Sequence, residues 1–538
     1  MIPLHVHSCY SFLEGTITIP KLIERASSFG LKSLALTDTN GMYGLIAFAK
    51  QAAEAGIKPI LGAYLDDPND SDLAALFYAR NNIGYSELCK LITIRRLRDD
   101  FNLADVFEKE LNNFFIISSS LNLIQKIPHR QNLFAGLIIS KTQKAETRRL
   151  YEYACSKAIK LVAIRPVYLL DKEDYDIHKI LRAIHFNKTI DNLSENEVRD
   201  SEYYFANPVE DQNLWKSIPE AIANTEYIAR HCNVDLKFNQ YKFPKYDLPD
   251  RQDAFSKLWE LSHEGLRKRY NVITEKLLEK LSYELQVIRD LNFTDYFLIV
   301  WDIVREAHSR GMLLIGRGSA ANSLVAYCLG LTQVDPVELN LYFERFLNKG
   351  RSSPPDVDLD FSWKERDEIV KYVFDKYGYE NVAMISTHVT FKARSAFRET
   401  AKAFGLSDEE ISKYAKYIPW TDAENLPKVA ELFPESRSLN FKVEPWKSIV
   451  ETAAKIANFP RHLSIHPSGI LITPEPITNY TALEYAKNKG LGLIITQPDM
   501  YGVEDLGLIK IDLLSQRSLA VLRDTMDKLN SPRSEDEI

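Results

Sequence analysis

The chain has 538 residues, of which 45% are hydrophobic and 26% are charged, and its formal net charge is −7. A chain of this length is too long for one hydrophobic core, so it indicates a globular protein of about three or four domains. The negative net charge excludes a general attraction to nucleic acid. Any phosphate binding must therefore come from local basic patches.

The five cysteines lie far apart without a Cys-x-x-Cys spacing, which argues against a disulfide framework and a thiolate zinc site. No apolar run reaches membrane length, and the N-terminal residues lack the basic and then apolar pattern of a secretory signal. We therefore expect a cytoplasmic protein with no membrane partner.

The first 225 residues alternate short apolar runs with amphipathic helical patterns. The runs lie at 33–38, 58–65, 113–120, 134–140 and 160–170, and the helical patterns lie at 18–30 and 46–56. This alternation is typical of an α/β barrel or a layered α/β sheet. We expect a first domain over residues 1–225.

The remaining chain begins with a linker at 237–255, which contains prolines and mixed charge. Helical patterns follow to about residue 310, and a strand, a glycine turn and a helix follow at 312–331. Residues 364 to about 460 are mostly helical and charged. Strands return in the last segments, at 469–473, 490–496 and 507–514.

The stretch SSPPDVDLDF places Asp356, Asp358 and Asp360 at every second position. On a strand, these side chains would share one face at steps of about 6.6 Å. Two carboxylates about 4 Å apart repel by about 4 kcal/mol at an effective dielectric constant of 20, so such a face needs open water or a cation.

This acidic strand has three possible interpretations: a calcium loop, a solvated edge strand and a divalent-metal site. A calcium loop is excluded, because Phe361 stands at the required glycine position and Asp367 stands where a bidentate glutamate is needed. A solvated edge strand and a divalent-metal site for phosphate chemistry both remain open.

Residues Gly316, Arg317, Gly318 and Ser319 form a turn from a strand into a helix. Free backbone N–H groups and the helix dipole favour an anion at such a turn, and an arginine can donate two hydrogen bonds to phosphate. The turn is not a Walker loop, because no Gly-Lys-Ser/Thr sequence follows. A simple tight connection would also explain it.

A later strand, IKIDLL, puts Lys510 and Asp512 on one face. An isolated acid in a strand is usually an exposed edge feature. Two acid-bearing strands separated by a helical insert, with a phosphate-type turn upstream, are nevertheless what two-metal phosphoryl transfer requires.

Six segments together resemble the catalytic core of the alpha subunit of bacterial DNA polymerase III, a family C DNA polymerase. The segments, in the family's order, are DYFLIVWDIV, GRGSAANSLVAYCLGLTQVDP, LYFERFLN, PPDVDLDF, RHLSIHPSGILIT and LGLIKIDLL. PPDVDLDF and RHLSIHPSG resemble the error-prone, repair and translesion paralogues more than the main replicase. The resemblance implies a palm over 226–390 and 468–538 and a helical thumb over 391–467.

The resemblance also implies roles for the acidic residues. Asp356 and Asp358 match the paired metal-binding aspartates of the palm, and Asp512 matches the third. Asp360 has a supporting role. The implied cofactor is a pair of Mg²⁺ ions.

The same resemblance implies that a set of palm residues binds the phosphates of the incoming dNTP. They are Arg317, Gly318, Ser319, Arg345 and Lys510.

In the thumb, the resemblance puts Lys392, Arg394 and Arg398 near the nucleic-acid backbone. A solvated helix face would explain these three residues equally well. His462 and His466 are expected to be positioning or core residues rather than metal ligands.

The segments LHVHSCYSFLEG and ALTDTNGMYG resemble the PHP domain, a metal-dependent phosphoesterase barrel that is commonly joined to these polymerases. His5 and His7 on one strand face are a credible metal pair, with Glu14 as a further ligand. The implied fold class is therefore α/β and α+β multidomain, with a PHP-like α/β barrel followed by a polymerase palm and an inserted thumb.

The chain departs from the PHP pattern where the other ligands belong. Thr39 replaces the histidine of the Thr-Asp-His motif, and Tyr64 stands where an acid is expected. Pro166 and Tyr168 stand in place of the Asn-Asp-x-His run. We therefore expect a degenerate, structural PHP domain without a bound transition metal or hydrolytic activity.

The expected substrates are primer-template DNA and dNTPs. Family members continue into fingers and a clamp-binding segment, so we expect a fragment that ends before the fingers and could be inactive without them. Contacts with a sliding clamp and other replisome or repair subunits would lie in that further region. Two alternatives are a PHP-type phosphoesterase or exonuclease and a non-catalytic DNA-binding fragment.

Overall fold

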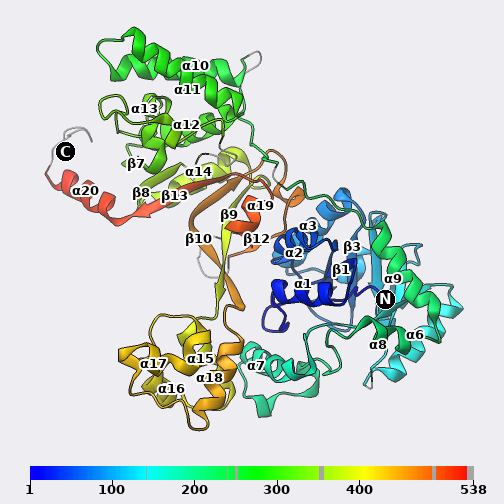
Figure 1. Ribbon diagram of the computed structural model, residues 1–538. Helices are drawn as coiled ribbons and strands as arrows, with labels where there is room; N and C mark the ends of the chain where they lie inside the picture. Colours follow the sequence, from blue (N-terminus) through cyan, green and yellow to red (C-terminus); the bar gives the residue numbers. More distant parts are fainter. Residues whose placement is uncertain are drawn as a thin grey trace.

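The computed structural model describes residues 1–140, 142–238, 240–248, 252–350, 355, 357–486 and 492–529. It has three parts (Figure 1): a barrel domain (residues 1–238), a large-sheet domain that follows it, and a helical insert (residues 391–459) within the large-sheet domain. Asp356 lies outside the described residues.

The barrel domain is built on a six-stranded sheet. Its strands, in spatial order, are β1 (Ser33–Leu36), β2 (Lys58–Asp66), β3 (Ala74–Ala79), β4 (Phe114–Ser118), β5 (Leu133–Ile138) and β6 (Lys160–Ile164). β3 is antiparallel to both of its neighbours, and the other pairs are parallel. The predicted α/β fold of this region is confirmed, although the strand β3 was not among the predicted strands.

The N-terminal segment joins the two edges of this sheet. On one side, the Thr37 N–H in the chain just after β1 donates to the Val6 carbonyl at 2.8 Å. On the other side, the His7 N–H donates at 2.8 Å to the carbonyl of Val167, which follows β6. The barrel is thereby closed, and His5 and His7 belong to the closing segment.

Helices surround the barrel because its central strands are apolar along their whole length and need cover on both faces. These helices are α1 (Ile19–Ser28), α2 (Leu45–Glu54), α3 (Asn82–Leu97), α4 (Leu103–Val106), α5 (Leu121–Lys126), α6 (Lys144–Ser156), α7 (Tyr175–Phe186), α8 (Pro208–Leu214) and α9 (Pro219–His231), with short 3-10 turns η1 (Lys172–Asp174), η2 (Ile190–Asn192) and η3 (Glu195–Glu197). The Asn81 side chain caps α3 by accepting from the Gly84 N–H at 2.9 Å.

The second domain contains a seven-stranded mixed sheet. Its strands are β7 (Leu314–Arg317), β8 (Asp358–Ser362), β9 (Val382–Thr390), β10 (Pro460–Ile472), β11 (Leu483–Tyr485), β12 (Ile494–Asp499) and β13 (Lys510–Gln516). Their spatial order is β11-β12-β9-β10-β13-β8-β7. The β13–β8 and β12–β9 pairs are parallel, so strands distant in the sequence meet at the centre of the sheet.

The sequence prediction of helices across residues 364 to 460 missed β9. Its first five residues are buried, but the last four, from Thr387, are only partly buried. That outer half pairs with β10 in a two-stranded ribbon that leaves the sheet (Figure 1), so its side chains do not show the pattern of a buried strand. The β9–β10 register shifts between Ile465 and Ile470.

The large-sheet domain also contains helices, most of which share a hydrophobic core with the sheet. They are α10 (Ala254–Arg269), α11 (Glu275–Asp290), α12 (Thr294–Ser309), α13 (Leu324–Cys328), α14 (Arg366–Tyr377), α19 (Met500–Asp505) and α20 (Arg517–Lys528), with 3-10 turns η4 (Gly318–Asn322), η5 (Phe343–Arg345) and η8 (Ile477–Asn479). Asp302 of α12 is fully buried and accepts from the Tyr372 hydroxyl at 2.8 Å and the Tyr377 hydroxyl at 3.0 Å.

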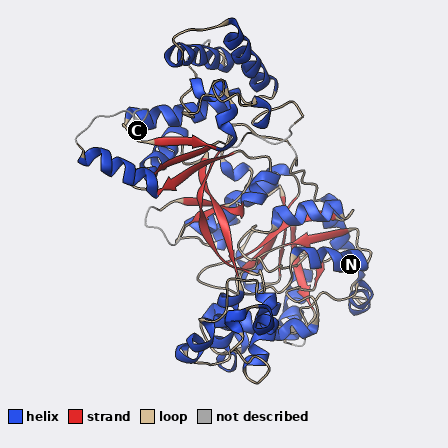
Figure 2. Ribbon diagram, turned by 60° about the vertical axis from the view of Figure 1, so that its left-hand side comes forward, coloured by secondary structure: helices blue, strands red, loops and turns tan. Residues whose placement is uncertain are grey.

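The helical insert lies at the far end of the β9–β10 ribbon (Figure 2). It contains α15 (Ala393–Ala403), α16 (Asp408–Ala415), α17 (Val429–Leu432) and α18 (Trp446–Lys455), with 3-10 turns η6 (Ala423–Lys428) and η7 (Pro434–Ser436). Its core also includes Ile177 and Leu181 of α7, so the insert packs on the barrel domain. The predicted thumb, 391–467, includes the first residues of β10.

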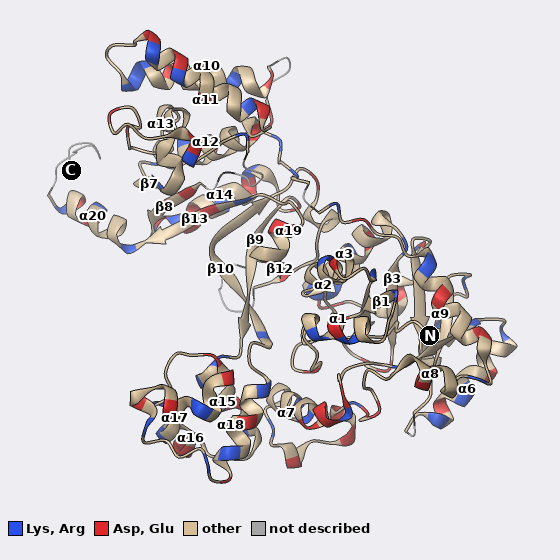
Figure 3. Cartoon of the chain, in the orientation of Figure 1, with Lys and Arg blue, Asp and Glu red and all other residues tan. Residues whose placement is uncertain are grey.

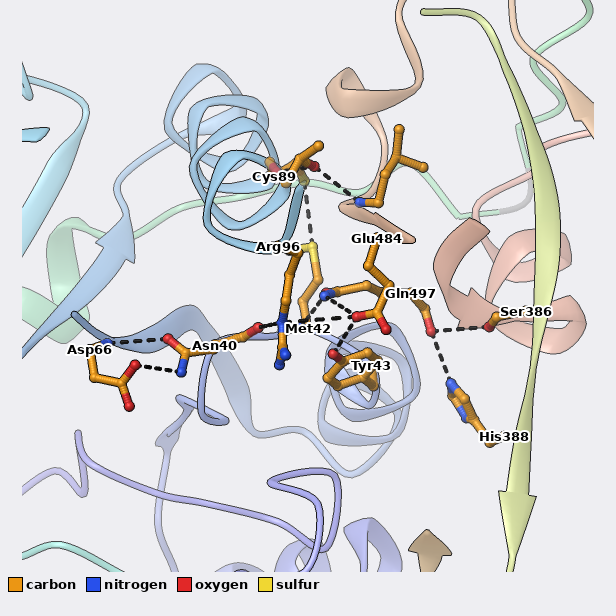
Figure 4. A network of polar contacts seen from close by, with 12 residues as sticks. Asn40, Met42, Tyr43, Asp66, Cys89, Arg96, Ser386, His388, Glu484 and Gln497 are labelled. Atoms are coloured by element: carbon orange, nitrogen blue, oxygen red, sulfur yellow. Dashed lines mark hydrogen bonds and ion pairs between the residues drawn. The ribbon is translucent and has the colours of Figure 1, made fainter. Parts of the chain in front are cut away.

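A polar network joins the barrel domain to the large sheet (Figure 4). Glu484 of β11 accepts from the Tyr43 hydroxyl at 2.5 Å and from Gln497 Nε2 at 3.3 Å. The Met42 N–H donates to Gln497 Oε1 at 2.9 Å. Ile385 of β9 is part of the barrel's hydrophobic core, so the two domains share one packed interior.

Within the described ranges, no helix combines the length and the apolar composition that crossing a membrane would need.

Candidate active site

The acidic residues of β8 and β13 meet on one face of the large sheet. Asp358 and Asp512 are register partners on adjacent parallel strands. Adjacent strands lie about 4.8 Å apart, and register partners point to the same face. The Asp358 side chain is 22% exposed and that of Asp512 is 8% exposed. Two carboxylates 154 residues apart in the chain are thereby side by side at the surface of the sheet.

The Arg317 turn lies beside these carboxylates. β7 pairs antiparallel with β8 and puts Arg317 opposite Asp358. Arg317 Nη1 lies 3.3 Å from Asp358 Oδ2, and Arg317 Nε donates to Asp360 Oδ1 at 3.1 Å. Glycine is required at Gly318, whose φ is +77°. A side chain at Gly316 would meet the Leu331 carbonyl oxygen at 1.6 Å, so glycine also allows this strand to approach its neighbour.

Both carboxylate oxygens of Asp512 have partners. The Lys510 ammonium lies 2.5 Å from Oδ2, and the buried Ser468 hydroxyl donates to Oδ1 at 2.8 Å. Gly469, the register partner of Asp512 on β10, donates its N–H to His466 Nδ1 at 2.9 Å. His466 therefore holds the turn that carries Ser468, and its positioning role stays a prediction.

The remaining predicted phosphate contacts lie at the edge of this face. Ser319 is half-buried in η4, and its carbonyl accepts from Asn322 Nδ2 at 3.0 Å. Arg345 is exposed at the end of η5, which packs against η4. The structure thus brings Arg317, Lys510 and Asp512 together around Asp358, with Arg345 on a neighbouring turn.

This donor set fits a hard divalent cation, because Mg²⁺ prefers carboxylate oxygens. In the structure, Arg317 neutralises Asp358 and Lys510 neutralises Asp512, so each carboxylate has a cationic side chain beside it where a metal ion would bind. The part of the chain that the structure describes contains no group of three or more His, Cys, Asp or Glu side chains placed to hold a metal. Asp356, the third predicted acid, is not in that part.

The three predicted DNA contacts of the helical insert make contacts within the insert. The Lys392 ammonium donates to Asp422 Oδ1 at 2.6 Å, and Arg394 Nη2 donates to the Ile418 carbonyl at 2.6 Å. Arg398 Nη1 donates to the Ser412 hydroxyl at 3.3 Å. Figure 3 shows both charge signs interspersed on these helices. Their DNA-binding role stays a prediction.

In the barrel, His5, His7 and Glu14 are buried close together. The His5 ring stacks on Tyr64 with ring centroids 5.2 Å apart, and the His7 ring stacks on Tyr168 at 4.0 Å. Burial holds the pKa of both imidazoles well below its usual value. Tyr64 and Tyr168, which replace PHP ligands, therefore pack as rings against the remaining histidines.

Glu14 is paired with an arginine from a distant loop. Arg199 Nε donates to Glu14 Oε1 at 2.7 Å, and the Thr39 hydroxyl donates to Oε2 at 3.1 Å. Burial acts to raise the pKa of Glu14, but the charges of Arg199 and Arg182 outweigh it and lower the pKa to about 2. Glu14 is therefore ionised and neutralised internally.

Sequence reasoning missed three residues of these sites: Ser468, Gln516 and Arg199. Ser468 lies within RHLSIHPSG, and Gln516 extends the alternation of Lys510 and Asp512 to a donor that reaches Asp360 Oδ2 at 3.3 Å. Gln516 was accessible from strand periodicity, whereas Ser468 lies within a register shift that such periodicity does not predict. Arg199 meets Glu14 from 185 residues away, and no local pattern indicates that contact.

Comparison with known proteins gives two family matches. Residues 256–515 match the family described as the bacterial DNA polymerase III alpha NTPase domain, and residues 3–148 match the PHP domain. The two matches define a class of protein in which a PHP domain precedes a polymerase alpha domain.

The similar proteins carry two names. An error-prone DNA polymerase of Symbiobacterium thermophilum is 34% identical over 98% of this chain and 52% of its own length. The DNA polymerase III subunit alpha of Bacillus subtilis is 33% identical over 97% of this chain and 49% of its own, and that of Escherichia coli is 31% identical over 99% and 49%. Residues 256–515 thus match the bacterial DNA polymerase III alpha family, and the chain spans about half the length of these relatives.

Proposed function

We propose that the chain is the PHP, palm and thumb part of a DNA-directed DNA polymerase that transfers nucleotides from dNTPs to a primer 3′-hydroxyl. The observation that supports this most is the in-register pairing of Asp358 and Asp512, with Arg317 and Lys510 on the same face. The large-sheet domain is then the palm, and the helical insert is the thumb.

In this proposal Asp358 and Asp512, with Asp356, hold two divalent ions. Such ions would supply the positive charge that two-metal phosphoryl transfer needs on its attacking and leaving oxygens. Ser468 and His466 keep Asp512 in place, because the Ser468 hydroxyl holds Oδ1 and His466 holds the Gly469 turn.

Arg317 and Lys510 are proposed to change partners during binding. Each now neutralises a carboxylate of the acidic face. The Arg317 side chain is 46% exposed, so it can turn toward a triphosphate once its carboxylate has another cation. Asp360 keeps Arg317 near the site through its bond to Nε. Gly318, Ser319 and Arg345 would complete the phosphate contacts.

The proposed partners follow from the same assignment. They are primer-template DNA and dNTPs for this chain, and a sliding clamp with replisome or repair subunits for the further part of the relatives. The relatives include error-prone DNA polymerases, which supports a repair or translesion role.

The test compares a double substitution, Asp358→Asn with Asp512→Asn, with the matched control Asp524→Asn. Asp524 is half-exposed on α20 and pairs with Lys364 away from the acidic face. Mn²⁺ binding to the chain and extension of a primed template are measured. We expect the double variant to lose Mn²⁺ binding and extension, and the control to keep both.

Unchanged Mn²⁺ binding in the double variant would contradict the proposal, whether or not the chain extends a primer. Phosphoester hydrolysis that survives this substitution would favour the PHP-type phosphoesterase. Steeply salt-dependent duplex binding without turnover or Mn²⁺ binding would favour a DNA-binding fragment.

A further inference from the structure

The PHP fold implies a metal centre in the barrel, and the residues present there do not fit one. Both oxygens of Glu14 are engaged by Arg199 and Thr39. Among the described residues, no three ligand-type side chains are placed to hold a metal, and the positions of the other PHP ligands carry Thr39, Tyr64 and Tyr168.

The hydrogen bonds of two neighbouring hydroxyl groups also fix the tautomer of His7. Its Nδ1 lies 2.9 Å from the Ser11 hydroxyl and 3.3 Å from the Thr39 hydroxyl. The Ser11 hydroxyl donates to Asp38 and the Thr39 hydroxyl donates to Glu14, so neither proton is available to the ring. Nδ1 of His7 must therefore be the donor.

We propose that Arg199 replaces the metal ion of the PHP centre as a built-in cation. Its guanidinium neutralises Glu14, the acid that the fold retains, at 2.7 Å. It also lies over the Tyr168 ring, with the guanidinium carbon 5.1 Å from the ring centroid. A fixed positive charge at this place opposes a second cation, so the barrel is stable without a transition metal.

The same ion pair connects the barrel to the helical insert through α7. The buried ring of His178 on α7 donates from Nδ1 to the Glu14 carbonyl at 2.7 Å and accepts from the Arg199 N–H at 2.9 Å. Ile177 and Leu181, on the same helix, belong to the core of the insert. The Glu14–Arg199 pair therefore sets the position of α7, and α7 positions the insert.

Neighbouring charges are consistent with a built-in cation. Arg182 of α7 adds a second positive charge near Glu14 and donates from Nε to the Glu197 carbonyl at 2.8 Å. Arg199 lines both a cavity of about 350 Å³ beside His5 and a larger cavity of about 1000 Å³ that reaches Arg461 and His462. Arg199 therefore lies where the two cavities adjoin, as does Ser71, which also lines both.

Metal content and thermal unfolding test the proposal without reference to polymerase activity. We expect the purified chain to contain less than about 0.1 equivalent of zinc, manganese or iron. EDTA, or added ZnCl₂ or MnCl₂, should change its Tm by less than about 1 °C. A stoichiometric transition metal, or a large loss of Tm in EDTA, would overturn the proposal.

Substitutions test the ion pair itself. Glu14 is buried whereas Arg199 is 38% exposed, so Arg199→Met leaves a buried carboxylate without its nearest cation and should lower Tm by about 5 °C or more. Glu14→Gln combined with Arg199→Met removes both charges and should recover at least half of that loss. Arg25→Met is the matched control, because Arg25 makes two bonds of 2.8 Å to Asp171. Asp171 is 50% exposed whereas Glu14 is 7% exposed, so water can replace the lost arginine and the loss of Tm should be small.

Hydrogen exchange separates the connecting role from simple destabilisation. The unsubstituted chain and Arg199→Met are compared at a temperature where both are folded. The substitution should increase amide exchange in α7 and α15 and leave the exchange of β8 and β13 unchanged. Two results would overturn the proposal. One is equal protection of α7 in the unsubstituted chain and in Arg199→Met, and the other is a Tm of Glu14→Gln with Arg199→Met no higher than that of Arg199→Met alone.

Discussion

The barrel centre and the acidic face of the large sheet both place carboxylates beside basic side chains, and they differ in access. In the barrel, Glu14 is 7% exposed and is held by Arg199 together with Thr39. On the sheet, Asp358 is 22% exposed, and its partner Arg317 is 46% exposed. The Arg199 side chain is itself 38% exposed, so the two arginines differ little in access. The difference lies in the carboxylates, because Glu14 is buried with both oxygens engaged, whereas Asp358 is partly open to solvent.

A second comparison concerns two buried glutamates. Glu14 has arginine partners, and its pKa falls to about 2. Glu284 of α11 is fully buried and accepts from neutral donors, the Ser323 hydroxyl at 2.9 Å and the Val325 N–H at 3.1 Å. Burial raises the pKa of Glu284 to about 7. A cation therefore decides whether a buried acid is charged.

The largest expected effect is a difference in primer extension between substitutions in the acidic face and in the barrel centre. Asp512→Asn should lower primer extension by about 1,000-fold, because it removes a proposed cation ligand. Glu14→Gln should change extension by less than about 2-fold, since its centre is proposed to be structural. Steady-state extension rates of the two variants, at equal folded fraction, check this. Equal losses would break the comparison.

Substitutions of Arg317 and Arg199 should change different quantities, the first nucleotide binding and the second stability. Arg317→Met should raise KM for dNTP by about 10-fold to 100-fold, because a charged hydrogen bond to phosphate is lost, with little change in Tm. Arg199→Met should lower Tm and leave KM for dNTP unchanged. Nucleotide titrations and thermal scans of both variants give the two readouts. A rise in KM for Arg199→Met alone would reverse the assignment.

The third prediction is a pH dependence of stability caused by Glu284. Its pKa is about 7 in the folded chain, against about 4.3 in an unfolded chain. The folded state binds the proton more tightly, so this contribution is complete below about pH 4 and is lost as pH rises through 7. The loss amounts to about 4 kcal/mol.

Glu284→Gln keeps an acceptor for Ser323 and Val325 but does not titrate. The difference in Tm between the unsubstituted chain and this variant should therefore fall by several degrees from pH 5 to pH 8. Thermal scans at four pH values measure it. A constant difference would show that Glu284 does not change its charge over this range.

The smallest effect is expected at Ser468. Ser468→Ala removes the hydroxyl that holds Asp512 Oδ1, and a lost hydrogen bond of about 1 kcal/mol should raise the half-maximal Mg²⁺ concentration by about 5-fold. Ser386→Ala is the matched control, because Ser386 is a buried serine of β9 that donates to the carbonyls of Gln497 and Pro498. A shift of equal size in both variants would contradict a specific role.

Strand periodicity predicted much of the acidic face. It put Asp358 and Asp360 on one face of a strand, and Lys510 and Asp512 on one face of another. The parallel register that joins these strands depends on the order of strands in the sheet, which no local pattern contains. The family resemblance supplied that juxtaposition.

The fold of the barrel was predictable, and the loss of its metal site stays a prediction. The proposed replacement cation had no signal in the sequence. Arg199 lies in an irregular loop after η3, and a lone arginine in a polar loop resembles any surface residue. The outer half of β9 was missed for a related reason. The last four residues of β9 are all partly buried, so they show no alternation between buried and exposed positions.

The register shift in β10 has a mechanical consequence. It falls between Ile465 and Ile470, in the segment that carries His466 and Ser468. A change in the angle of the long ribbon would bend the strand at this point and displace the hydroxyl that holds Asp512. Movement of the helical insert would thereby reach the acidic face through this strand.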